Sequence, residues 1–166
     1  MAVRLDDTIR KTLAEATGPE RTRAALTAVI RHFGADMGMV HRLNSADRHL
    51  ELVATSDGVP EPVLAAARRI PLGKGIAGET ALTGKAVSMC NLQTDTSGVA
   101  RPGARATGAQ GTLCVPVFQG DQVVGTLGIG VRGERTFTET ETAELLAAGR
   151  ALADTLRETA SEPPGA

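Results

Sequence analysis

Residues 112–131 have the sequence TLCVPVFQGDQVVGTLGIGV, which contains the strongest indication of the fold. Apolar and small residues run along both sides of the turn QGD, a pattern typical of two strands joined by a tight connection. Such a short connection joins antiparallel strands, because parallel strands need a crossover of a dozen or more residues. The stretch therefore predicts a hairpin with strands at 112–118 and 122–131.

Further strands are indicated on the N-terminal side of this hairpin. Residues 37–44 and 49–55 alternate on either side of the turn NSADR and predict a second antiparallel hairpin. Residues 86–90 predict a short strand, and RIPL at 69–72 a short extended piece. We expect an α+β fold with one antiparallel sheet of five to six strands.

Helical patterns flank these strands. Residues 6–17 predict a helix capped by Asp6 or Asp7 and ended by Gly18, and a second helix is expected from Pro19 to Gly34. Residues 61–69 can form one or two helical turns. The last helix is expected to start at a capping box, in which Thr138 and Glu141 each satisfy a free backbone N–H of the other.

The stretch GKGIAG, Gly73 to Gly78, matches the G-x-G-x-x-G pattern of dinucleotide sites, and Asp95 follows at a suitable distance. That fingerprint needs a buried parallel strand before it and a full helix after it. RRIPL before it is polar and contains proline, and the helix at 76–83 ends at Gly84. We therefore expect Gly73 and Gly75 to form a turn and Gly78 to allow close packing.

Composition limits the function classes. The 166 residues contain 42% hydrophobic and 22% charged residues, which is typical of one globular domain. Lys and Arg number 18 against 19 Asp and Glu, so no basic excess favours nucleic acid. There is no Trp or Tyr and only three Phe, which disfavours bases or flat cofactors as ligands.

The chain is expected to form a single unit in the cytoplasm. No apolar run approaches the ~18 residues of a membrane span, and MAVRLDDTIRK lacks the apolar core of a signal peptide. Two cysteines without an export signal favour free thiols. We divide the chain into an N-terminal helix at 1–18, a domain at 19–158 and a disordered tail at 159–166.

Three stretches in this order resemble the GAF family of sensory domains. They are IPLGKGIAGETALTGKAVSMCNLQTD at 70–95, TLCVPVFQGDQVVGTLGIG at 112–130 and RTFTETETAELLAAGRALAD at 135–154. The resemblance spans residues 20 to 157. It implies a sheet with the terminal helices on one face and a ligand pocket on the other, under short helices and a long loop.

The resemblance implies no particular ligand. The cyclic-nucleotide motif of the family is missing, and neither Cys90 nor Cys114 is followed by the His of a bilin attachment site. The family's free methionine-R-sulfoxide reductases use cysteines in the short helix and in the loop before the V-P strand. Ala77 occupies the helix position here, and the loop at 91–111 has no cysteine. Asn91 stands where the family usually has aspartate.

Candidate ligand-binding residues follow from strand alternation and from the loop. The pocket floor is expected from the strands, one wall from the helix at 76–83 and the roof from the loop at 91–111. The candidates are Met39, His41, Leu52, Ile76, Cys90, Asn91, Asp95, Arg101, Arg105, Thr112 and Cys114. The loop is either a lid, in which the two arginines clamp an anion, or a mobile, solvated segment.

Three functions remain open. The favoured one is a non-enzymatic sensor that binds a small metabolite and signals through terminal helices that form a homodimer, with another signalling protein as a further partner. The second is a thiol-based redox sensor or reductase using Cys90 and Cys114, which a disulfide can also join. The third is a dimerisation module without a ligand. Cofactors are unknown, and haem or a metal at His41 is disfavoured because it needs further ligands.

Overall fold

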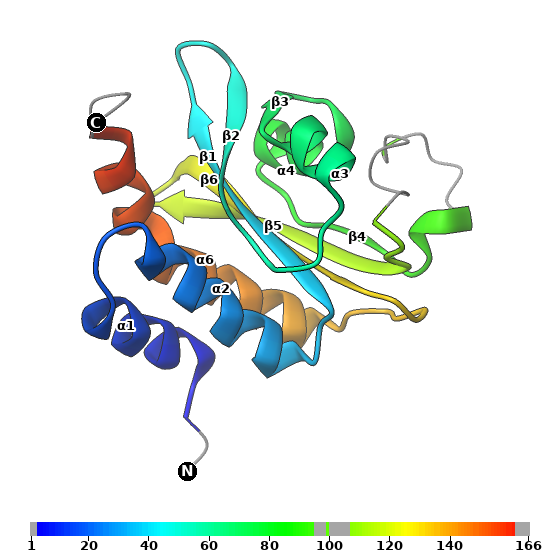
Figure 1. Cartoon of the computed structure of the whole chain (residues 1–166), viewed down its shortest axis with the longest axis horizontal. Coiled ribbons are helices and arrows are strands. Elements are labelled where there is room, and N and C mark those ends of the chain that lie inside the picture. The colour runs from blue at the N-terminus through cyan, green and yellow to red at the C-terminus, as the bar shows by residue number, and fades with distance from the viewer. Residues whose placement is uncertain (1–2, 95–98, 100–106, 162–166) are drawn as a thin grey trace.

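The computed structural model describes residues 3–94, Val99 and residues 107–161, with side chains described as far as Arg157. One antiparallel sheet runs through the molecule in the strand order β3-β2-β1-β6-β5-β4 (Figure 1). The strands are β1 (Met37–Asn44), β2 (His49–Thr55), β3 (Arg69–Pro71), β4 (Val87–Met89), β5 (Gly111–Gln119) and β6 (Gln122–Val131). The two predicted antiparallel hairpins, β1–β2 and β5–β6, are confirmed.

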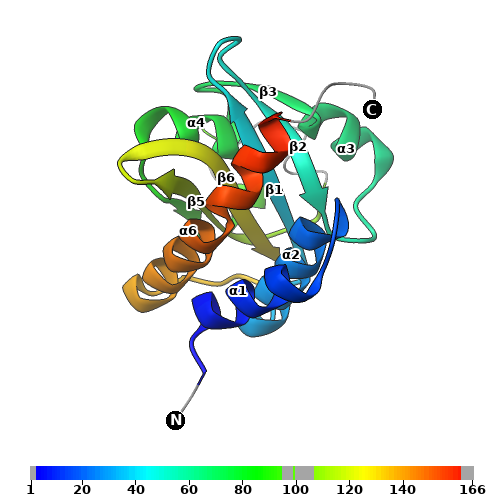
Figure 2. The same cartoon turned by 90° about the vertical axis from the view of Figure 1, so that its left-hand side faces the viewer.

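The helices lie on opposite sides of this sheet (Figures 1 and 2). They are α1 (Leu5–Glu15), α2 (Glu20–Phe33), α3 (Glu61–Ala67), α4 (Gly75–Thr83) and α6 (Glu139–Ser161), with a 3-10 turn η1 (Leu92–Thr94). The helices α2 and α6 pack on one face, and α4 packs on the other. The predicted α+β architecture is therefore confirmed. No helix in the described part of the chain combines the length and apolar character needed to cross a membrane.

The main core lies between the sheet and the terminal helices. Alternate residues of β5 and β6 point toward α2 and α6 and are almost completely buried, namely Leu113, Val115, Val117, Leu127 and Ile129. Their neighbours in sequence point to the opposite face. The register of the β5–β6 pair therefore assigns one face to the helices and leaves the other for α3 and α4.

The helix α1 forms a second layer against α2 and α6 (Figure 2). Its apolar residues Leu5, Ile9 and Leu13 are buried in that contact. The sequence indicates an unusually wide apolar arc on α6, which suggests a surface for a partner helix. In the structure Ala153 is buried within the single chain, and Leu146 packs against the same core. The homodimer remains a prediction, but this arc no longer supports it.

Several helix ends differ from the sequence prediction. The helix α1 begins at Leu5 and ends at Glu15, before Gly18, and it has no side-chain cap. Asp6 and Asp7 lie in its first turn instead, where carboxylates complement the helix dipole. At the other end α6 continues to Ser161, into the segment predicted as a tail, because no helix-breaking residue precedes Pro163.

The glycines of GKGIAG have the predicted structural roles. Gly73 and Gly75 have φ values of 82° and 67°, which side chains disfavour. A Cβ atom on Gly78 would lie 2.6 Å from the carbonyl oxygen of Pro71, so α4 can approach β3 only with glycine there. Because the neighbouring strands are antiparallel, the stretch does not belong to a βαβ unit.

The capping box at the start of α6 gives a direct test of this fold. The Glu141 N–H donates to the Thr138 hydroxyl at 3.1 Å, and the Thr138 N–H donates to the Glu141 carboxylate at 3.0 Å. Thr138→Ala should lower the free energy of unfolding by about 1 kcal/mol in urea denaturation. Thr142→Ala is the control, because its hydroxyl only bonds back to the Thr138 carbonyl within the helix. Equal losses in the two variants would contradict a specific role for the cap.

Candidate ligand pocket

A cavity of about 450 Å³ lies on the sheet face opposite the terminal helices. Strands β1, β6 and β5 form its floor, while α3 and the start of α4 form its walls. Leu92, Thr107 and Ala109 line it from the segment that precedes β5. This volume is within the range of pockets that hold small organic ligands.

Three cross-strand rows make up the floor. The central residue of each row is on β6: Thr126 lies opposite His41, Gly128 opposite Met39 and Cys114, and Gly130 opposite Met37 and Thr112. Successive rows are two residues apart, so the floor extends over roughly 13 Å along the strands. The rows run from a polar end at His41 and Thr126, through an apolar middle, to Thr112.

Glycine on the central strand creates the depth of the cavity. Gly128 and Gly130 project no side chain into the middle of the floor. A Cβ atom on Gly128 would lie 3.5 Å from the Cys114 sulfur, an ordinary contact, and the Gly128 backbone is in a conformation that other residues adopt. A larger residue at position 128 would therefore occupy cavity space without forcing the sheet apart.

The helix α3 is a wall that the sequence interpretation missed. Val63, Ala66 and Ala67 line the cavity, and Ile70 follows them on β3. The spacing of three and four residues from Val63 to Ala66 and Ala67 is typical of one apolar helix face. The sequence EPVLAAARRI contains this spacing, which indicates an apolar face as well as one or two helical turns.

His41 is a buried, neutral residue at the polar end of the floor. Its side chain is 3% exposed, and Nε2 lies 2.9 Å from the carbonyl oxygen of Ala67. A carbonyl only accepts, so Nε2 carries the proton and donates it. Burial lowers the pKa of His41, and the bond to Ala67 offsets that effect only in part. Its Nδ1 atom is then a hydrogen-bond acceptor.

Two buried hydroxyls on the floor have no partner. Thr112 is 8% exposed and Thr126 is 1% exposed, and neither hydroxyl has a hydrogen-bond partner among the described residues. Buried polar atoms without a partner are uncommon, because each costs about 1–3 kcal/mol. A molecule in the cavity is the nearest source of partners for both.

Cys114 is a neutral thiol between these hydroxyls. Burial raises its pKa to about 11, although the nearby hydroxyls of Thr80 and Thr126 favour the thiolate. The Thr126 hydroxyl lies beside the sulfur without a well-directed hydrogen bond. The strand β6 separates the backbones of Cys114 and His41 by roughly 9 Å or more, and the side chains that act on the thiol are the hydroxyls of Thr80 and Thr126.

The two cysteines are not placed to form a disulfide. Cys114 lies opposite Val87 on β4, and Cys90 is three residues further on, roughly 10 Å along the strand. A disulfide requires Cα atoms within about 7 Å. Both cysteines are free, Cys90 is exposed, and Cys114 is buried.

The predicted site residues fall into three groups. Five of them line the cavity: Met39, His41, Ile76, Thr112 and Cys114. Leu52, Cys90 and Asn91 do not line it. Asp95, Arg101 and Arg105, and with them the centre of the predicted lid, lie outside the described residues.

The place of β2 in the sheet explains why Leu52 is absent from the floor. After a β-bulge at Val53, Leu52 lies opposite His41 and therefore on the same face of the sheet. The floor, however, is formed by β1, β6 and β5, and β2 lies beyond β1. Alternation along a strand predicts the face of a residue but not the position of its strand in the sheet.

Asn91 has a structural role beside the cavity. Its side chain donates to Glu134 at 2.8 Å and accepts from the Gln93 N–H at 3.0 Å. These bonds hold the start of the segment after β4 against the loop between β6 and α6. Within the described residues, no three His, Cys, Asp or Glu side chains gather in a way that could hold a metal ion.

Comparison with known proteins places this geometry in context. The sequence model of the GAF domain matches residues 16–157. The GAF domain of a phosphoenolpyruvate-protein phosphotransferase from Coxiella burnetii has a TM-score of 0.79 at 17% identity, covering 95% of this chain and 93% of that one. The corresponding GAF domain from Acinetobacter has a TM-score of 0.77 at 16% identity, covering 96% and 95%.

An enzyme has a similar fold. The free methionine-R-sulfoxide reductase of Neisseria meningitidis, solved in complex with its substrate, has a TM-score of 0.75 at 17% identity, covering 94% of this chain and 88% of that one. Identities this low establish a shared fold and do not transfer an activity. None of the curated proteins compared with the chain matches its sequence.

The different settings of the two thiols give a test of the site. At pH 8 a thiol with a pKa of about 11 is ionised in roughly one molecule per thousand, so Cys114 should resist alkylation. Iodoacetamide on the native protein should modify Cys90 only, as peptide mass spectrometry would show. In denaturant both cysteines should react. Rapid alkylation of Cys114 in the native protein would contradict a closed, neutral environment.

Proposed function

Because the chain belongs to the GAF domain family, we propose that it is a non-enzymatic regulatory domain that binds a small molecule in the cavity above β1, β6 and β5. The observation that carries this proposal is the pair of buried, unpartnered hydroxyls of Thr112 and Thr126 in the lining of that cavity. Hydroxyls without a partner destabilise a packed core, whereas a bound molecule can supply their missing hydrogen bonds.

The environment of the cysteines favours binding over thiol chemistry. A thiol nucleophile needs a low pKa or an adjacent base. Cys114 has a raised pKa and no nearby imidazole, and exposed Cys90 lies outside the cavity lining. A reductase related to the neighbouring methionine-sulfoxide enzymes is therefore the second candidate. Turnover of free methionine-R-sulfoxide that disappears in Cys90→Ser or Cys114→Ser would favour it.

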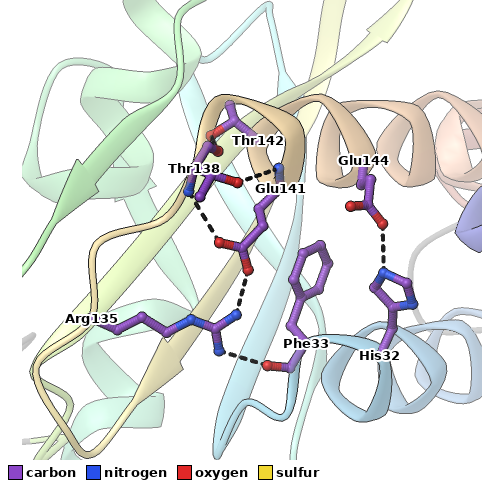
Figure 3. Close-up of polar contacts among 7 residues, drawn as sticks. All are labelled: His32, Phe33, Arg135, Thr138, Glu141, Thr142 and Glu144. Atoms are coloured by element: carbon purple, nitrogen blue, oxygen red, sulfur yellow. Dashed lines mark hydrogen bonds and ion pairs between the residues drawn. The ribbon is translucent and has the colours of Figure 1, made fainter.

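Contacts of the segment beside the cavity indicate how binding reaches the terminal helices. Asn91 bonds to Glu134, and the carbonyl of Cys90 accepts from the Arg135 N–H at 3.2 Å. The Arg135 guanidinium donates to the carbonyl of Phe33 at 2.6 Å, at the end of α2, and to the Glu141 carboxylate at the start of α6 (Figure 3). One residue thus connects the segment after β4 with both helices.

A second contact joins the same two helices. His32 of α2 lies 2.6 Å from the carboxylate of Glu144 on α6 (Figure 3). Together with Arg135, this pair holds the end of α2 against the first turns of α6. We propose that ligand binding changes the position of the segment after β4 and, through Arg135, the packing of these helix ends. A second copy of the chain or another signalling protein would detect that change.

Filling the cavity tests the binding proposal. In Gly128→Val, the new side chain should occupy the middle of the floor and prevent ligand binding. The free energy of unfolding should stay within about 1 kcal/mol of the wild type, because valine suits a strand. Native mass spectrometry of protein purified from its own source should show a bound metabolite in the wild type that is absent from the variant. Gly133→Val is the control, because a Cβ atom there meets nothing within 4 Å.

Two outcomes would contradict the binding proposal. A wild-type protein that carries no metabolite after native purification and extract incubation would favour the dimerisation-only alternative, which light scattering would then examine. Equal retention of a metabolite by wild type and Gly128→Val would place its site elsewhere on the chain.

The connection through Arg135 has its own test. Arg135→Met removes both side-chain hydrogen bonds and should cost about 1–2 kcal/mol of stability, since the groups are partly exposed. Hydrogen exchange should show that loading with the co-purified metabolite alters protection at the end of α2 in the wild type but not in Arg135→Met. Arg31→Met, at an exposed position of α2, is the control. A preserved response in Arg135→Met would reject this route.

A further inference from the structure

We infer that the ligand is an elongated, uncharged, aliphatic molecule whose hydrogen-bonding head group lies between His41 and Thr126. This inference rests on the proposed function, because it assumes that the cavity is the binding site. It goes further by naming the chemical class that the cavity can accept. Four properties of the described lining lead to it: its shape, its lack of Phe, Tyr and Trp side chains, its charge and the pairing of its polar atoms.

The shape of the floor favours an extended molecule. The rows at Thr126, Gly128 and Gly130 follow one strand over roughly 13 Å. Side chains border this line on both sides, with Met39 and Met37 from β1 and Cys114 and Thr112 from β5. Gly128 leaves a channel in the middle of this line, and Ala109 and Met37 limit it over Gly130 at the far end. An alkyl chain can lie along such a channel, with the flexible methionines closing around it.

The described lining has no Phe, Tyr or Trp side chain on which a flat ring could stack. The chain has three phenylalanines and no tyrosine or tryptophan. Phe33 and Phe137 belong to the core on the opposite face of the sheet, and Phe118 lies near Arg150. None of the three lines the cavity. Contacts with the body of the ligand come instead from aliphatic side chains, which favours an aliphatic body.

The electrostatics disfavour a charged group on the floor. Lys74 is the one charged side chain among the described lining residues, and it is exposed. His41, the titratable base on the floor, donates a hydrogen bond from Nε2 to the Ala67 carbonyl. It is neutral because burial lowers its pKa. A charge buried against the floor would have no counter-ion among the described lining residues, which costs several kcal/mol. The head group should therefore be uncharged.

The polar end of the floor selects the head group. His41 and Thr126 are direct cross-strand partners, so their side chains start roughly 5 Å apart. The Nδ1 atom of His41 accepts a hydrogen bond, and the unpartnered Thr126 hydroxyl can donate one. A primary amide supplies the matching N–H and carbonyl oxygen in one planar group. A terminal alcohol satisfies the same pair less completely.

A matched set of probes tests this class. Isothermal titration calorimetry would compare octanamide, octanoate, octylammonium and 3-phenylpropanamide as ligands of the intact chain freed of metabolite. Octanamide should bind at least tenfold more tightly than either charged C8 probe and more tightly than the aromatic amide. Gly128→Val should abolish the binding of octanamide, which places the probe on the floor.

Two near-isosteric variants locate the head group. Thr126→Val should weaken octanamide binding about tenfold, whereas Thr112→Val, at the far end of the floor, should weaken it less. The reverse result would overturn the assigned orientation. Unfolding of each variant in urea, measured without ligand, would show that the comparison is made between folded proteins.

The remaining outcomes separate this inference from the proposed function. Octanoate binding as tightly as octanamide would assign the head group to Lys74 at the rim, and tight binding of 3-phenylpropanamide would reject the aliphatic body. In both cases the cavity remains a binding site. If no probe binds while the wild type, but not Gly128→Val, still co-purifies with a metabolite, the inferred ligand class is wrong and the proposed binding function stands. If neither occurs, both proposals fail.

Discussion

The register between β5 and β6 is the constraint on which the rest of this structure depends. Because strand side chains alternate, Leu127 and Ile129 face the terminal helices, and Thr126 and Gly128 face the cavity. A slip of one residue would turn the apolar residues into the pocket and bury threonine and glycine under α6. The tight turn at Gly120 and Asp121 and the bulge between Val117 and Phe118 together set the pairing, and the same pairing determines both the core and the site.

Features encoded by neighbouring residues were predictable from the sequence. The β5–β6 hairpin, the Thr138–Glu141 cap and the turn at Gly73 each depend on a few adjacent residues with strong conformational preferences. Features that depend on the arrangement of distant elements were not predictable. The covering of α6 by α1 is an example, since a wide apolar arc on a helix does not reveal whether the same chain or another chain covers it.

The same contrast between local features and the arrangement of distant elements applies to the candidate site. Alternation placed Met39, His41, Thr112 and Cys114 on one face, and the structure brings all four together around the cavity. Leu52 does not line the cavity, because β2 lies beyond the three floor strands, and the position of a strand in the sheet is not evident from hydrophobic periodicity. Glycines are also easily overlooked in such a search. They contribute no functional group, yet the space above Gly128 is part of what makes this face a pocket.

The position of Gly128 also affects how proteins of this architecture can diverge. At most core positions a change in side-chain volume lowers stability, because it disturbs the packing of the surrounding side chains. At Gly128 the backbone has no positive φ and an added Cβ atom makes only ordinary contacts, so a new side chain would extend into the cavity. Single substitutions from glycine through alanine to valine would then shorten the accessible channel in small steps while the core on the far face stays intact. Ligand size can thus evolve separately from folding at this one position.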